Sequence, residues 1–323
     1  MSNHSRYALR ASFTEGAKWV TGCEMSGAEF RHETMLYDDM DEFRRGTVSF
    51  LEMALADGAR PLAVVSEKKV AVLQEELGRD ADRVEFADIE VVGRNPARII
   101  PLWREFAARH SGTPLRGIGE PVWAERSAAA LDEARRHEHL LNLAFASARD
   151  FWLLCPYDRA TLDTSVVQAA DSSHGCMTAD VDYVDVAFGG VLSSPPATAT
   201  AFTLIAEKLH RLREEVEKFA FAAGIAAARV PGFVLAVDEV ATNSVRYGGG
   251  SGVAIVWSDA DAVLCEVRDR GQVTDPLAGR RTPHRERAGG RGLWIANQLC
   301  DLVQLRSGPN STRVRLSINR PAT

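Results

Sequence analysis

Long apolar runs are missing from this sequence. A membrane-spanning helix needs about 18 or more consecutive apolar residues, and no such run occurs among the 323 positions. The first six residues, MSNHSR, also lack the apolar stretch of a secretory signal. We therefore expect a cytoplasmic protein that has no membrane partner.

Cysteine is scarce, odd in number and scattered, since the chain has only Cys23, Cys155, Cys176, Cys265 and Cys300. No two of them form a C-x-x-C pair, which argues against a disulfide framework and against a zinc knuckle. We expect reduced thiols, most of them buried.

Histidine and cysteine also lack the paired spacing of a metal site. His174 stands near Cys176, and Cys23 stands near His32, but neither pair is joined by a second one. His32 as a ligand residue of a sensor stays open, although the pattern favours a buried, hydrogen-bonded histidine.

A P-loop is absent from the first half. No G-x-x-x-x-G-K-[ST] motif follows the apolar run at 62–65, so this half is not expected to hydrolyse nucleotide. Near-continuous apolar runs at 60–66 and 150–155 are typical of strands buried on both faces. Helical stretches alternate with these runs, at 41–57, 67–77, 97–110 and 122–148. The pattern predicts an α/β domain with a doubly wound, mainly parallel sheet.

Charge is shared unevenly between the halves. Residues 193–323 hold 17 Lys and Arg against 13 Asp and Glu, whereas residues 1–192 hold 21 against 31. Because the first half is strongly acidic, we expect no direct contact between it and nucleic acid.

Three short motifs follow one another in the second half. Glu239 and Asn243 are four apart on a predicted helix and so project from one face, where they could serve as a base and a metal ligand. Asp269-Arg270-Gly271 ends a predicted strand and offers a carboxylate to an adenine amino group. A glycine cluster at 289–292 opens a predicted helix whose free amides would face phosphate. In this order the three motifs predict an ATP site.

Arginines crowd the segment between the second and third motifs, at Arg280, Arg281, Arg285, Arg287 and Arg291, with only Glu286 opposing them. Such a loop suits a triphosphate. A solvated basic loop without a ligand is the alternative, and the position between two glycine motifs favours the triphosphate.

A linker and a long helix are predicted to open the second half. Residues 193–200 are rich in Pro, Ser, Thr and Ala and cannot continue a helix or a central strand. Apolar residues then recur at spacings of three and four from 202 to 223, which predicts an amphipathic helix of about six turns. This helix would lie on a sheet, or pack in part against a second copy of the chain in a homodimer.

The rest of the second half predicts a sheet with helices on one side. Strands are expected at 253–257, 262–268 and 312–318, and helices around Glu239 and at 293–300. In the last strand Arg313 and Arg315 alternate outward, which predicts one open face. The result is an antiparallel or mixed α/β sandwich.

Two family resemblances cover most of the chain. On the three motifs, residues 200–320 resemble the GHKL (Bergerat) ATPase group, the histidine-kinase-like fold, and within it the bacterial anti-sigma-factor serine kinases. Residues 28–185 resemble the MEDS sensory domain of methanogen and methylotroph regulators, on the stretches 32–38, 116–123, 138–142 and 155–158. The resemblances imply an N-terminal extension at 1–27, a MEDS-like sensory domain at 28–192, a linker at 193–200 and a GHKL ATPase or kinase domain at 201–323.

The GHKL resemblance also implies roles for single residues. Asn243 would ligate the Mg²⁺ of ATP, Asp269 would bind the adenine amino group, and Gly271 would let the backbone approach the base. The phosphates would lie against a set that comprises Arg287, Gly289, Gly290, Arg291, Gly292 and Leu293. Thr312 would support Asp269.

Glu239 would be the catalytic residue in the kinase branch, as the base that takes a proton from a serine or threonine hydroxyl or from water. A helix-surface carboxylate paired with Arg246 or Lys218 is the structural alternative for Glu239. The sequence departs from the family at Val273, where a second glycine is usual, and a side chain there would narrow the nucleotide pocket or reshape its lid. A version that binds partners without catalysis therefore stays open.

A sensor histidine kinase is a less favoured alternative. His137 lies about one hundred residues before Asn243, which suits a phosphoacceptor helix, but the apolar run at 151–155 replaces the helical hairpin that should follow. A histidine on a helix face is the favoured interpretation of His137.

The resemblances predict a signal-responsive anti-sigma regulatory protein. The sensory domain would detect an unknown small molecule or protein. The ATPase domain would phosphorylate an anti-sigma-factor antagonist of the STAS type and sequester a sigma factor. Phosphorylation would add charge at the contact between the two proteins and break it. A non-catalytic adaptor for antagonist or phosphatase proteins is the alternative.

Overall fold

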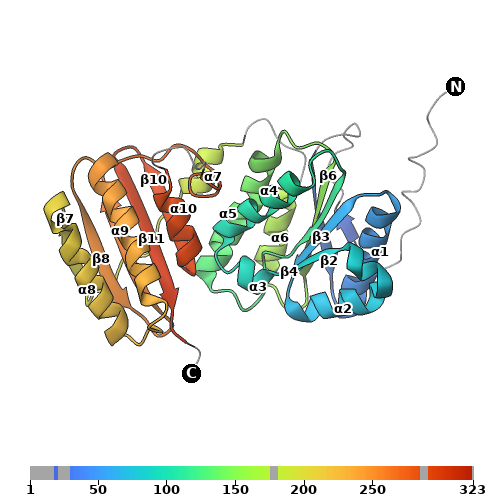
Figure 1. Cartoon of the computed structure of the whole chain (residues 1–323), viewed down its shortest axis with the longest axis horizontal. Helices are drawn as coiled ribbons and strands as arrows, with labels where there is room; N and C mark the ends of the chain where they lie inside the picture. The colour runs from blue at the N-terminus through green and yellow to red at the C-terminus, as the bar shows by residue number, and fades with distance from the viewer. Residues whose placement is uncertain (1–17, 21–29, 175–180, 284–289, 322–323) are drawn as a thin grey trace. The chain divides into compact units, whose positions relative to one another are not determined.

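The computed structural model describes residues 18–20, 30–174, 181–283 and 290–321 (Figure 1). The chain divides into two compact units that are each built from separate segments. The first unit holds residues 1–87, 113–124 and 149–176, and the second holds residues 88–112, 125–148 and 177–323. The predicted limits at 27, 192 and 200 stay predictions.

A six-stranded sheet forms the centre of the first unit, in the order β1-β2-β6-β5-β3-β4. Strands β2, β6, β5 and β3 run parallel, and β1 pairs antiparallel with β2. The strands are β1 (Lys18–Val20), β2 (Arg31–Tyr37), β3 (Arg60–Val65), β4 (Glu85–Asp88), β5 (Leu115–Gly119) and β6 (Phe151–Asp158). The parallel sheet is confirmed.

The helices of the first unit are α1 (Met40–Ala56), α2 (Glu67–Leu77) and α6 (Thr164–Ser173), with a 3-10 turn at Gly78–Arg83. Helix α1 begins where the Asp39 carboxylate accepts from the backbone amide of Glu42, an N-cap of the usual kind. Both α1 and α2 pack on β3, and their apolar faces form a core with Met35, Tyr37 and Leu154 of the strands. The bounds of α1 and α2 agree with the predicted helices.

A five-stranded antiparallel sheet forms the centre of the second unit, in the order β10-β11-β9-β8-β7. The strands are β7 (Thr200–Leu204), β8 (Gly252–Ser258), β9 (Ala262–Asp269), β10 (Leu302–Gly308) and β11 (Ser311–Asn319). Helices α8 (Leu209–Ala222), α9 (Val230–Tyr247) and α10 (Gly292–Leu299) lie on one face of this sheet, and their apolar sides share its core (Figure 1). The α/β sandwich with an antiparallel sheet is confirmed.

Four further helices belong to the second unit: α3 (Ile89–Val92), α4 (Ile99–Arg109), α5 (Ala128–Phe145) and α7 (Tyr183–Phe188), with 3-10 turns at Pro96–Arg98 and Ala206–Lys208. Helix α5 begins six residues later than the predicted start at 122, because Ser127 takes the N-cap position and accepts from the amide of Ala130. Within the described residues, every helix is too short or too polar to span a bilayer.

Two strands of the second unit differ from the prediction. The apolar repeat from 202 was predicted to be helical throughout, but Thr200–Leu204 is the edge strand β7 and the helix begins only at Leu209. Pairing with β8 decides the backbone here, and Phe202 and Leu204 stand two residues apart, the spacing that puts both side chains on one face of a strand. Strand β10 was not predicted at all.

The open face predicted at Arg313 and Arg315 was also wrong. Both guanidinium groups bind the carboxylate of Glu266 on β9, at 2.8 and 2.6 Å, and Glu266 is fully buried. Arg315 further donates to the carbonyl oxygen and the hydroxyl of Ser193, and Arg313 to the carbonyl oxygen of Leu192. The alternating arginines therefore form a covered ion cluster on β9 and β11.

Candidate functional site

The first and third motifs meet at the start of α10. Glu239 and Asn243 lie one turn apart on α9 and are both half-buried. A Cβ atom placed on Gly292, the first residue of α10, would lie 2.6 Å from Asn243 Nδ2 and 3.0 Å from Glu239 Oε2. Only glycine lets the amides at the start of α10 come this close to both side chains.

The second motif lies next to the C-terminal end of α9, whose C-cap Gly248 stands five residues beyond Asn243. Gly248 follows the last turn of α9, and its carbonyl oxygen accepts from the amide of Arg270 at 3.1 Å. A Cβ atom on Gly248 would lie 2.4 Å from Asp269 Cγ, so this contact also requires glycine. The Asp269 carboxylate accepts from the amide of Gly271 at 2.7 Å, which fixes the turn.

Thr312 supports this turn through Gly271. It faces Asp269 across the β9–β11 ladder, and its hydroxyl donates to the carbonyl oxygen of Gly271 at 2.9 Å. The Thr312 and Ser307 hydroxyls are also hydrogen-bonded at 2.9 Å. Ser307 in turn accepts from the amide of Val273 at 2.8 Å, so the position that departs from the family is tied to β10.

The glycine cluster is described only in part. Gly290 has a φ of +75°, a conformation that favours glycine, and Arg291 is exposed. Leu293 is half-buried and packs on the core beneath the helix. Arg287 and Gly289 lie outside the described residues.

Two arginines of the predicted basic loop bind carboxylates of the chain. Arg281 pairs with Asp275 at 2.6 Å. Arg280 is buried with a nitrogen 3.8 Å from a Glu133 oxygen, and burial lowers the pKa of its guanidinium. Both side chains are engaged within the chain, and a role for them beside a triphosphate stays a prediction.

Asn297 on α10 was not among the predicted site residues, yet its hydrogen bonds link three segments of the chain. Its amide nitrogen donates to the carbonyl oxygen of Gly279 at 2.9 Å, and its side-chain and main-chain oxygens accept from Asn95 at 3.1 Å. Gly279 has a φ of +72° and leads into Arg280. The signal in the sequence was an amide side chain within an otherwise apolar helical stretch, because such a group needs hydrogen-bond partners once it is buried.

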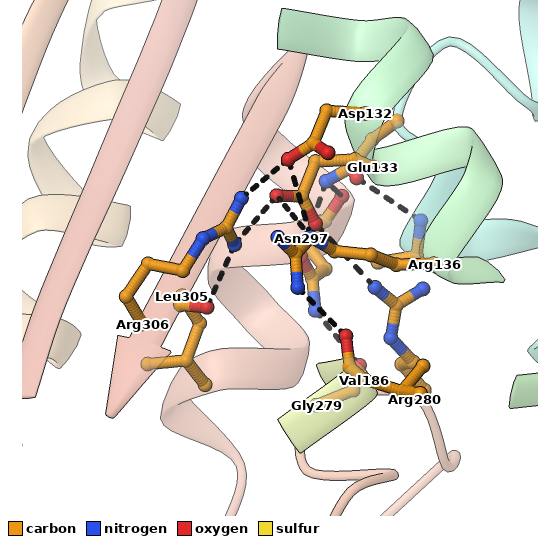
Figure 2. A network of polar contacts seen from close by, with 11 residues as sticks. Asp132, Glu133, Arg136, Val186, Gly279, Arg280, Asn297, Leu305 and Arg306 are labelled. Carbon is orange, nitrogen blue, oxygen red and sulfur yellow. Dashed lines mark hydrogen bonds and ion pairs between the residues drawn. The ribbon is translucent and has the colours of Figure 1, made fainter. Parts of the chain in front are cut away.

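A buried ion cluster lies beside this link (Figure 2). Arg306 on β10 binds Glu133 at 2.8 Å and Asp132 at 2.7 Å, both on α5. Arg136 donates to Asp132 and to the carbonyl oxygen of Val186 on α7. Burial raises the pKa of Glu133, and the nearby guanidinium groups of Arg306 and Arg280 oppose that effect. The cluster joins α5 and α7 to the edge of the antiparallel sheet.

The grouped residues fit a nucleotide with Mg²⁺. Asn243 and Glu239 offer an amide oxygen and a carboxylate, the oxygen donors that this ion prefers. The amides of α10 begin directly beside them and favour anionic groups. The site residues themselves stay a prediction.

Residues 31–175 match the family model MEDS, the methanogen/methylotroph DcmR sensory domain, and residues 202–318 match the model of the histidine kinase-like ATPase domain. The chain joins a MEDS domain to a histidine kinase-like ATPase domain. The resemblances to the MEDS domain and to the histidine-kinase-like ATPase group are therefore confirmed, and the narrower resemblance to the anti-sigma-factor serine kinases stays a prediction. Asn95 and Glu133, which contact α10 and β10, belong to the part that matches MEDS.

One similar solved structure is that of the RsbU and RsbW domains of Rv1364c from Mycobacterium tuberculosis. The identity is 20%, the TM-score is 0.30, and the match covers 39% of this chain and 34% of that one. The match therefore spans about a third of that protein. No curated protein matches the chain.

Proposed function

We propose that the ATPase domain binds Mg²⁺ and ATP and phosphorylates a serine or threonine of an anti-sigma-factor antagonist of the STAS type. The observation that carries the proposal is the packing of Glu239 and Asn243 against Gly292 at the start of α10. In this arrangement the carboxylate of Glu239, the amide oxygen of Asn243 and the backbone amides at the start of α10 lie close together, as a base, a metal ligand and phosphate-binding donors would have to.

Each motif has a role in this proposal. Asn243 holds the Mg²⁺ ion, which neutralises phosphate charge when it is bound. Asp269 accepts from the adenine amino group, and the bond between Thr312 and Gly271 keeps the turn that positions it. The amides that begin at Gly292 bind phosphate oxygens.

Glu239 acts as the general base. It takes the proton of the attacking hydroxyl, whose oxygen forms a bond to the γ-phosphorus while the bond between that phosphorus and the β–γ bridging oxygen breaks. ADP leaves and a phosphorylated antagonist results. The added charge would weaken its contact with the kinase, which releases the antagonist and changes the sequestration of a sigma factor.

The MEDS domain would control the ATPase domain through direct contacts between side chains. Asn95 and Glu133 lie in the MEDS match and contact α10 and β10 directly. A signal that moves α5 or the turn at Pro96–Arg98 would act on α10, whose other end faces Glu239 and Asn243. Localisation in the cytoplasm, where the antagonist and the sigma factor would be, is part of the same proposal.

The test is transfer of radiolabelled phosphate from ATP to a purified STAS-type antagonist, with Glu239→Gln and Asn243→Ala beside the unaltered chain. We expect transfer by the unaltered chain, loss of transfer with retained ATP binding in Glu239→Gln, and loss of ATP binding in Asn243→Ala. Antagonist binding with no transfer by the unaltered chain would instead establish the adaptor.

The alternative of a sensor histidine kinase is disfavoured by the position of His137. This residue on α5 is fully buried, so its ring is not exposed to accept a phosphoryl group.

A further inference from the structure

Three side chains of the ligand type gather in the first unit: His32 on β2, Cys155 on β6 and His174 at the end of α6. They lie 123 and 19 positions apart in the sequence, but their ligand atoms are all within 4.8 Å of one another. The exposed fractions are 7%, 1% and 1%, so the cluster is shielded from water.

Parallel pairing of β2 and β6 brings the first two together. Thr34 faces Cys155 in the register, and His32 lies two residues before Thr34 on the same face of the strand. His32 and Cys155 are therefore diagonal neighbours across the ladder. The distance from His32 Nε2 to Cys155 Sγ is 3.2 Å.

The orientation of His174 adds a second, independent observation. Its Nδ1 lies 2.8 Å from the carbonyl oxygen of Ala170, so Nδ1–H donates to this oxygen and Nε2 is the nitrogen that can bind an ion. The ring of His174 lies against that of His32, with centroids 4.1 Å apart, and edge-on to that of Tyr157. A histidine ligand whose other nitrogen is held by a carbonyl oxygen is the usual arrangement at metal sites.

We propose that His32, Cys155 and His174 are ligands of a Zn²⁺ ion in the MEDS domain. Bond lengths of about 2.0–2.1 Å to nitrogen and about 2.3 Å to sulfur place the donors of a tetrahedral site with two nitrogens and one sulfur roughly 3.3–3.6 Å apart. The His32–Cys155 distance of 3.2 Å lies just below this range and all the ligand atoms lie within 4.8 Å of one another, so small side-chain rotations would complete the site. The hydrogen bond from His174 Nδ1–H to Ala170 and the contact between the His174 and His32 rings hold the His174 ring beside the pair of His32 and Cys155.

Binding changes the protonation of the site in a defined way. The Cys155 thiol loses its proton to solvent and binds as thiolate, while both imidazoles bind as neutral rings. The ion then ties β2, β6 and α6 together. The proposal is independent of the proposed kinase reaction.

The full chain, purified with reductant and freed of metal by a chelator, is titrated with Co²⁺ and then with Zn²⁺. We expect a charge-transfer band from thiolate to Co²⁺ that saturates at one ion per chain and is displaced by Zn²⁺. Absence of the band in the unaltered chain would overturn the proposal, and this readout needs no variant.

Variants then identify the ligands. We expect Cys155→Ser to abolish the band, and His32→Gln and His174→Gln to weaken Zn²⁺ binding at least roughly tenfold, since each removes one ligand. Cys265→Ser is the matched control, because Cys265 is also a buried free thiol but lies in β9. A band of equal intensity in Cys155→Ser would overturn the assignment. Circular dichroism on every variant separates a lost ligand from a lost fold.

Discussion

Arg98 donates from its Nε to the carbonyl oxygen of Asn297 at 2.8 Å, and from Nη2 to the carbonyl oxygens of Gln298 and Cys300 at 2.7 and 2.8 Å. These are carbonyl groups at the end of α10, which have no partner inside the helix. A positive charge at a helix C-terminus also interacts well with the helix dipole. Arg98 of the MEDS match therefore caps the helix whose first residue lies beside Glu239 and Asn243.

Removal of this cap should loosen α10. We expect Arg98→Ala to cost about 1–3 kcal/mol locally, because buried carbonyl groups lose a charged donor, and so to speed amide hydrogen exchange of 292–300 roughly 5- to 150-fold. Mass spectrometry of that peptide measures the change. Arg109→Ala is the control on α4, since the pair of Arg109 with Glu105 is exposed. Equal exchange in both variants would contradict the role of Arg98.

The Arg306–Glu133 pair should be costly to break from one side. We expect Arg306→Met to lower the free energy of unfolding by about 3–5 kcal/mol, since it leaves the buried Glu133 carboxylate without its nearest cation. The double variant with Glu133→Leu should recover most of this loss. Urea unfolding followed by circular dichroism measures both. The control is Arg281→Met, whose exposed pair with Asp275 should matter little.

Gly292 should be essential for the nucleotide site but not for the fold. A methyl group there would press on Asn243 and Glu239, so we expect Gly292→Ala to weaken Mg-ATP binding by at least about tenfold, or roughly 1.4 kcal/mol. Titration calorimetry gives the affinity. Gly308→Ala is the matched control, because a Cβ at Gly308 would meet no atom within 4 Å. Unchanged affinity in Gly292→Ala would place the phosphates elsewhere.

Asp301 should make stability fall in acid. Burial by itself would raise its pKa, but hydrogen bonds from Arg229, the Asn319 amide and Arg94 outweigh burial and hold the pKa below the usual value. A carboxylate with a lowered folded pKa contributes stability above its unfolded pKa, about 3.9, and this contribution disappears as the pH falls through the folded value.

The test compares Asp301→Asn with the unaltered chain in urea at several pH values. We expect the difference in unfolding free energy to be constant at and above pH ~5 and to shrink below pH ~4. Asp80→Asn serves as the control, because Asp80 and its partner Arg83 are both more than half exposed. A difference that does not change with pH would show that the ionised carboxylate of Asp301 is not responsible.

Local sequence signals determined much of the fold. The apolar repeats predicted α1 and α2, the spacing of Glu239 and Asn243 put both on one face of α9, and the order of the three motifs predicted the ATPase domain. These features depend on neighbours within one or two turns or on one strand. They can be recognised before any tertiary contact is known.

Tertiary contacts decided the rest. Residues 200–204 form a strand because they pair with the edge of β8. Arg313 and Arg315 of β11, which were predicted to face outward, instead bind Glu266 on the neighbouring strand β9. The approach of His32 to Cys155 depends on the register between β2 and β6, and the cap of α10 by Arg98 joins residues 200 positions apart. Strand register and long-range ion pairs follow from packing of the whole chain, which no local pattern encodes.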